Sequence, residues 1–211
     1  MLPFDIKWVR AQFPALAQQT NGQPTIFFDG PGGTQVPHQV VDAVSKYLTD
    51  QNANTHGAFT RSIQTDEIIL SARSAMAQFL GCEKNEVIFG ANMTSLTFAF
   101  SRAIGRHLQP GDEVIITKLD HDANFAPWLA LEEYGVLTRT VDIYTEDCTL
   151  DMASLREQIN SRTRLIAIGY ASNAVGTIND IAEVVRLART VGAMVFIDAV
   201  HYAPHGPIDV R

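Results

Sequence analysis

Two segments place an ionisable side chain directly after an apolar run. In VFIDAVHYAPHGP, Asp198 ends the run and His201 follows three residues later. A carboxylate in this position either caps the following turn or acts as a fixed anion for a metal or a protonated ring nitrogen. In ITKLDHDANFAPW, His121 is either a solvated loop residue or a flat imidazole that stacks on an aromatic ligand. Neither segment has a recognised metal-ligand spacing, so no metal site is expected.

Two further segments offer neutral hydrogen-bonding groups. In VIFGANMTSLTF, a helix that starts near Asn92 leaves the main-chain N–H groups of Met93, Thr94 and Ser95 free for an anion such as a phosphate. Every helix has such an end, and the glycine patterns of dinucleotide folds and P-loops are missing, which disfavours a nucleotide-binding module. In GYASNAVGTIND, Asn173 either binds a ligand or helps to form the turn.

The apolar patterns predict an α/β fold in which strands and helices alternate. We expect strands at 113–117, 136–141, 164–169 and 193–198, and helices at 38–48, 65–80, 92–107, 124–134, 151–159 and 180–191. A short strand is also expected at 25–29, an apolar run at 86–89 and a loop at 52–60. This alternation predicts a three-layer domain with a mostly parallel sheet between helices. All four polar segments then fall at the carboxyl edge of the sheet, where ligands bind.

Composition sets the broad class of the protein. Its 211 residues are 46% hydrophobic and 18% charged, with a net charge of −7. The acidic balance argues against a nucleic-acid partner. Two cysteines are too few for a disulfide framework, and there is no long apolar segment or signal peptide, so a cytoplasmic protein without membrane contact is expected.

These segments together resemble the aminotransferase class V, cysteine desulfurase-like family of pyridoxal-phosphate enzymes of fold type I. GDEVIITKLDHDANFAPWLALEEYG is similar to the family segment with the cofactor-stacking histidine, and GAMVFIDAVHYAPHGPIDV to its D-x-x-Q/H segment. TRLIAIGYASNAVGTIND, NTHGAFTRS and FFDGPGGTQVP resemble further family segments in the same order. The resemblance implies pyridoxal 5′-phosphate as cofactor and a small amino acid as substrate.

The resemblance also implies a role for each matching residue. The implied cofactor contacts are stacking by the catalytic His121, pairing of Asp198 with the ring nitrogen, contact of His201 with the phenolic oxygen, orientation by Asn173, and phosphate binding by Thr94 and the Met93 amide. Asn54, His56 and the turn at 32–34 would lie on the substrate side. Family phosphate loops often read G-T-T where this chain has Asn92-Met93-Thr94, so one threonine contact is missing.

The resemblance further implies that the chain is an N-terminal portion. Residues 1–37 would be an N-terminal arm and 38–211 an incomplete large domain, with no small C-terminal domain. The family's Schiff-base lysine follows one strand beyond the D-x-x-Q/H segment, whereas all four lysines here lie upstream. The loop cysteine of desulfurases has no counterpart either, because Cys82 and Cys148 are interpreted as structural or incidental.

We therefore expect a desulfurase-like portion that is inactive alone, with an exposed sheet edge that favours oligomers or poor solubility. The complete enzyme would be a homodimer. Another class V reaction (an aminotransferase, kynureninase-like or epimerase-like activity) and a non-catalytic truncated remnant remain open, because a fold does not choose its chemistry.

Overall fold

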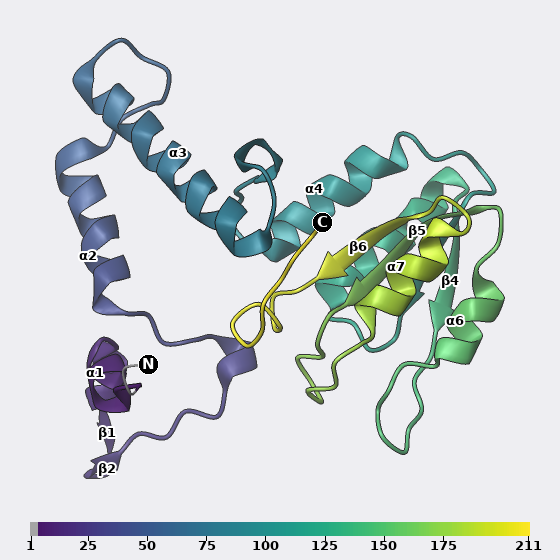
Figure 1. Cartoon of the computed structure of the whole chain (residues 1–211), viewed down its shortest axis with the longest axis horizontal. Helices are drawn as coiled ribbons and strands as arrows, with labels where there is room; N and C mark the ends of the chain where they lie inside the picture. The colour runs from purple at the N-terminus through teal and green to yellow at the C-terminus, as the bar shows by residue number, and fades with distance from the viewer. Residues whose placement is uncertain (1–3) are drawn as a thin grey trace. The chain divides into compact units, whose positions relative to one another are not determined.

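The computed structural model describes residues 4–211 and divides the chain into two compact units (Figure 1). One unit contains the residues up to Val87 together with Asp209–Arg211, and the other contains Ile88–Ile208. In the part of the chain that is described, no helix is long and apolar enough to cross a membrane.

The first unit is mainly helical. Its elements are α1 (Ile6–Ala11), β1 (Gln19–Thr20), β2 (Gln23–Pro24), α2 (His38–Lys46) and α3 (Thr60–Leu80), with short 3₁₀ or π turns at Pro14–Ala17, Gly30–Gly32, Tyr47–Gln51 and Lys84–Glu86. The strand expected at 25–29 is wrong. The extended pairing comes earlier, where Asn21 and Gly22, both with positive φ, form the tight turn between β1 and β2.

Helix α3 begins at Thr60, five residues before the predicted start. The first turns lie in the polar stretch TRSIQTD, which has too few apolar residues at helical spacing to predict a helix. Ser62 and Thr65 are nevertheless buried: the Ser62 hydroxyl accepts the Gly57 N–H at 2.6 Å, and the Thr65 hydroxyl donates to the Arg61 carbonyl at 3.0 Å. The first bond attaches the preceding loop to the first turn of the helix, and the second lies within the helix itself.

The second unit is built on a four-stranded, fully parallel sheet. Its strands are β3 (Glu113–Thr117), β4 (Leu137–Val141), β5 (Thr163–Gly169) and β6 (Met194–Asp198), in the spatial order β4-β3-β5-β6. All four strands predicted between residues 113 and 198 are therefore present. The chain leaves β3 towards β4 on one side, whereas it leaves β5 towards β6 on the other, so the gap between β3 and β5 is a topological switch point.

Helices cover both faces of this sheet, which confirms the predicted three-layer α/β architecture. On one face, Ile115 and Ile166 pack with Leu155 of α6 (Met152–Gln158) and Val184 of α7 (Ile181–Arg189). On the other face, the core is formed by side chains of β3, β5, α4 (Met93–Gly105), α5 (Ala126–Leu129) and the 3₁₀ turn Ala130–Tyr134. Trp128 of α5 is fully buried in this second layer.

The single helix expected at 124–134 is instead three short pieces. A 3₁₀ turn at Asp122–Asn124 precedes α5, and the 3₁₀ turn Ala130–Tyr134 follows it. Pro127 lies in the first turn of α5 and provides no N–H, which is tolerated only near a helix start. The apolar run expected at 86–89 is not a strand, and only the turn Lys84–Glu86 is regular there.

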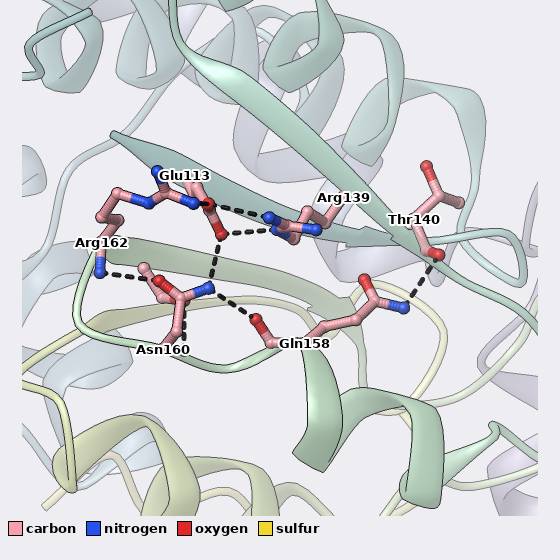
Figure 2. Close-up of polar contacts among 7 residues, drawn as sticks. Glu113, Arg139, Thr140, Gln158, Asn160 and Arg162 are labelled. Carbon is pink, nitrogen blue, oxygen red and sulfur yellow. Dashed lines mark hydrogen bonds and ion pairs between the residues drawn. The ribbon is translucent and has the colours of Figure 1, made fainter. Parts of the chain in front are cut away.

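A buried carboxylate fixes the amino edge of the sheet (Figure 2). Glu113, at the start of β3, is fully buried and accepts hydrogen bonds from Arg139 of β4 and from Asn160 at 2.7 Å. Arg162 adds an ion pair at 2.7 Å. The Arg139 hydrogen bond, helped by Asn160 and by the charges of both arginines, outweighs burial and lowers the pKa of Glu113 to about 2. The network therefore joins β3, β4 and the loop before β5.

Candidate functional site

The candidate site lies at the opposite, carboxyl edge of the sheet, around the switch point. The segment after β3 carries Asp120 and His121, and β6 ends at Asp198. β5 ends at Gly169, which is the register partner of Asp198, and Asn173 follows in the next turn. In open parallel sheets the crevice at a switch point is where ligands bind. The topology therefore brings three of the four polar segments from the sequence to one edge.

Asp198 caps a turn and still keeps one oxygen available. Its Oδ1 accepts the Val200 N–H at 3.0 Å, as the capping interpretation predicts. Among residues 4–211, no hydrogen bond is recorded to its Oδ2. The side chain is half-buried, and the main-chain carbonyl accepts the Tyr170 N–H at 2.8 Å. The carboxylate is thus held in place by the turn and can still pair with a cationic group.

His121 is exposed, and its ring orientation is fixed locally. Its Nδ1 accepts the N–H of Ala123 at 3.1 Å, which caps the 3₁₀ turn Asp122–Asn124. Because Nδ1 acts as an acceptor, the proton of the neutral ring is assigned to Nε2. The flat imidazole is therefore held by its own backbone while its faces stay accessible.

Asp120 is a site residue that the sequence analysis missed. Its Oδ1 accepts the Gly169 N–H, and its Oδ2 accepts from the Asn124 amide at 3.4 Å. Asn124 in turn accepts the indole N–H of Trp128 at 3.0 Å. Burial is the main cause that raises the pKa of Asp120 to about 7, and the charge of Asp198 raises it further. The Asp-x-x-x-Asn-x-x-x-Trp spacing was the available signal, since these side chains recur every four residues.

The start of α4 is partly different from the prediction. The Asn92 side chain caps the helix by accepting the Ser95 N–H at 2.8 Å, so Ser95 is not free for a ligand as expected. The N–H groups of Met93 and Thr94 are in the first turn, where no intrahelical acceptor exists. Met93 is half-buried and Thr94 is exposed. The anion site at this helix start is therefore reduced to two amides and the Thr94 hydroxyl.

The turn after β5 is formed by Ser172 and leaves Asn173 available. The Ser172 hydroxyl accepts the N–H groups of Ala174 at 3.2 Å and Val175 at 3.3 Å. Within the described residues, no side-chain hydrogen bond of Asn173 is recorded, and this residue is half-buried. Both roles expected for this segment therefore find a residue. Ser172 forms the turn, and the Asn173 amide is available to bind a ligand.

The segment after β6 carries three rings that form aromatic contacts. The rings of Tyr170 and Tyr202 stack with centroids 3.7 Å apart, and the rings of His201 and His205 meet edge to face at 5.6 Å. His201 is half-buried. Within residues 4–211, His, Cys, Asp and Glu side chains form no group of three or more that could hold a metal.

Asn54 and His56 belong to the other compact unit, and both are exposed. His56 has a φ of 63°, and its N–H donates to the Asp66 carboxylate at 3.0 Å. Its ring Nδ1 lies 3.4 Å from the same carboxylate. This pair of contacts attaches the loop of His56 to α3.

Comparison with known proteins identifies the family. The family model described as aminotransferase class-V matches residues 26–211. The chain belongs to the aminotransferase class-V family. A cysteine desulfurase of Pectobacterium atrosepticum is 35% identical over 214 residues, which cover 100% of this chain and 52% of that protein. A probable cysteine desulfurase of Mycobacterium leprae is 36% identical over 211 residues. The match covers 98% of this chain and 34% of that protein.

Two solved structures of cysteine desulfurases are also similar to this chain. The cysteine desulfurase CsdA of Escherichia coli, in an S-sulfonic acid form, superimposes with a TM-score of 0.84 at 27% identity and covers 99% of this chain. The apo cysteine desulfurase of Thermococcus onnurineus NA1 gives a TM-score of 0.88 at 25% identity and covers 100% of this chain. The chain spans about half the length of these relatives.

Class-V enzymes depend on pyridoxal 5′-phosphate, and the donor set of this chain fits that group. Asp198 provides a half-buried carboxylate with one oxygen available, which suits a protonated ring nitrogen. His121 provides a flat ring, and the amides of Met93 and Thr94 suit a phosphate at a helix start. No residue in this set conflicts in charge with the part of the cofactor it would meet.

Proposed function

We propose that this chain supplies the cofactor-binding portion of a pyridoxal-phosphate-dependent cysteine desulfurase-like enzyme that acts on a small amino acid. The observation that carries the proposal is the convergence of Asp198, His121 and Asn173 at one switch point of a parallel sheet. When bound, the cofactor supplies an electron-accepting ring that stabilises negative charge at the substrate carbon beside the amino group.

The residues of this chain would hold and tune the cofactor. Asp198 would keep a proton on the ring nitrogen, because a fixed carboxylate favours the charged pyridinium. His121 would cover one face of the ring and exclude water from it. Asn173 would orient a ring substituent or the substrate, and His201 would contact the phenolic oxygen. The Met93 and Thr94 amides with the Thr94 hydroxyl would bind the phosphate. Asn54 and His56 are proposed to contact the substrate.

The lysines of the chain do not suggest an attachment point for the cofactor. Lys118, which is nearest to His121 in the sequence, forms an ion pair with Asp142 at 2.5 Å beyond the end of β4. We therefore propose that the 211-residue polypeptide, by itself, binds the cofactor without a covalent link and has no desulfurase activity. Covalent labelling of one lysine by pyridoxal 5′-phosphate and borohydride, at one cofactor per chain, would contradict this.

Binding of pyridoxamine 5′-phosphate tests the proposal, because this amine form cannot react with surface lysines. Titration calorimetry should show one site per chain, and His121→Ala should weaken binding about tenfold through the lost stacking surface. His107→Ala is the matched control, since His107 is an exposed histidine near the end of α4. Absence of binding, or equal losses in both variants, would refute the proposed site.

We further propose a homodimer for the complete enzyme and a cytoplasmic location. Cys82 and Cys148 are both free and only partly exposed, which suits a reducing compartment.

A further inference from the structure

A second carboxyl group lies beside Asp198 at the switch point and has no part in the roles proposed above. Asp120 follows β3 by three residues and precedes the proposed stacking residue His121. Its Oδ1 accepts the N–H of Gly169, the last residue of β5. Gly169 is also the register partner of Asp198 in β6. Asp120 thus contacts the end of β5, the strand that pairs with β6 at Asp198, and it directly precedes His121 in the chain.

The contact between Asp120 and β5 depends on the absence of a side chain at residue 169. A Cβ atom added to Gly169 would lie 2.5 Å from Asp120 Oδ1, which is closer than such atoms approach in proteins. On its other side, Asp120 is held by Asn124, which is fully buried and bonded to the Trp128 indole. The carboxyl group is therefore fixed from two directions, by a main-chain donor of β5 and by a buried amide.

The surroundings of Asp120 disfavour a second negative charge. The charged group that faces it is Asp198 on β6, whereas Gly169, Asn124 and Thr117 present neutral hydrogen-bonding groups that lower the pKa of Asp120 without outweighing burial. Burial and the Asp198 charge raise the pKa of Asp120 to about 7. Lys118, two residues before Asp120, forms an ion pair with Asp142. Burial is therefore the main reason that Asp120 holds its proton more strongly than an exposed aspartate does.

We propose that Asp120 is a positioning residue of the cofactor site, which joins the ends of β3 and β5 and so holds the neighbouring His121 close to the Asp198 carboxylate. This inference rests on the proposed function for its purpose. Its geometry and its proton are properties of the chain without cofactor. They can therefore be measured separately from cofactor binding.

Carboxyl ¹³C NMR of the 211-residue chain without cofactor tests the proton directly. Asp120, assigned through Asp120→Asn, should titrate with a midpoint near 7. Asp198→Asn should lower this midpoint only in part, because the neighbouring charge is removed while burial, the main cause of the raised pKa, remains. Asp142→Asn, the same change beyond the end of β4, should leave it in place. An Asp120 that titrates like an exposed aspartate, or that does not respond to Asp198→Asn, would overturn the inference.

Binding of pyridoxamine 5′-phosphate between pH 6 and 8 tests the positioning role. At pH 6, Asp120→Asn should stay within about twofold of wild type, since the amide imitates a neutral acid, whereas Asp120→Ala should lose about tenfold. The ratio of wild-type to Asp120→Asn affinity should change with a midpoint near 7, because only wild type gains a charge there. A constant ratio, or an Asp120→Ala variant that binds like wild type, would refute the role. A wild-type chain that binds no ligand would refute the proposed function, while the NMR titration still decides the protonation of Asp120.

Discussion

Replacing Glu113 by Gln should destabilise the second unit by an amount that depends on pH. The pKa of Glu113 falls from 4.5 to about 2, and one pKa unit corresponds to about 1.4 kcal/mol, so the network favours the charged carboxylate by about 3 kcal/mol. Arg139 and Arg162 are 39% and 58% exposed, and solvent therefore screens part of the attraction. We expect Glu113→Gln to lower the free energy of unfolding at pH 7 by about 2 kcal/mol.

The pH dependence follows from the direction of the shift. A carboxylate with a lowered pKa in the folded state contributes stability above its unfolded pKa and loses it as the pH falls through the folded pKa. The difference between wild type and Glu113→Gln should therefore be full above pH 4.5 and vanish as the pH approaches about 2. Protonation of Glu113 removes in wild type the same charge that the substitution removes.

Urea unfolding monitored by Trp128 fluorescence measures this difference. The chain has two tryptophans, and a Trp8→Phe background leaves Trp128, which is fully buried in the second unit, as the reporter. Glu183→Gln is the matched control: the pKa of Glu183 is also lowered to about 2 by Arg186 and Arg156, but the cluster lies at the surface, so a smaller loss is expected. Equal losses in the two variants, or a Glu113→Gln loss that does not change with pH, would refute the reasoning.

Three further predictions concern packing, capping and association. Gly169→Ala should lower the free energy of unfolding by about 1–3 kcal/mol in urea titrations, since its Cβ would lie 2.5 Å from the Asp120 carboxylate; Gly32→Ala, with open space around it, is the control. Asn92→Ala should cost about 1 kcal/mol of stability by removing the cap of α4, and an unchanged urea midpoint would contradict the capping role. Sedimentation velocity should show oligomers of the 211-residue chain, because the valines of α2 are about half-exposed; a monomer at all concentrations would contradict this.

The sheet and its layers were predictable because their sequence signals are local and strong. Runs such as EVIIT and TRLIAIG are apolar on both sides of the strand, and the pattern of β5 buries six of its seven residues. Asp151 and Asp180 are the first residues of two expected helices, and each accepts a main-chain N–H at the start of α6 or α7. In these elements, local preference and tertiary packing favour the same conformation.

Two predicted elements were wrong where one or two residues redirect the backbone. The apolar residues of 25–29 suggested a strand, but the pairing is set earlier by the Asn21-Gly22 turn. Pro127 divides the expected helix into short turns.

The candidate site was only partly predictable. Residue types indicated Asp198 and His121, whereas the importance of Asp120 depends on its approach to Gly169, which is 49 residues away in the sequence. Such a contact exists only after β3 and β5 become neighbours. Ser95 was misjudged for a local reason, because the Asn92 side chain satisfies its N–H before a ligand can.

The central claim is that one flat ring lies between the Asp198 carboxylate and the His121 imidazole. A crystal structure of the 211-residue chain with pyridoxamine 5′-phosphate measures this most directly. The account predicts the ring nitrogen within hydrogen-bond distance of Asp198 Oδ2, the imidazole of His121 parallel to the ring, and the phosphate at the Met93 and Thr94 amides. A ligand bound elsewhere, or a ring that contacts neither Asp198 nor His121, would contradict it.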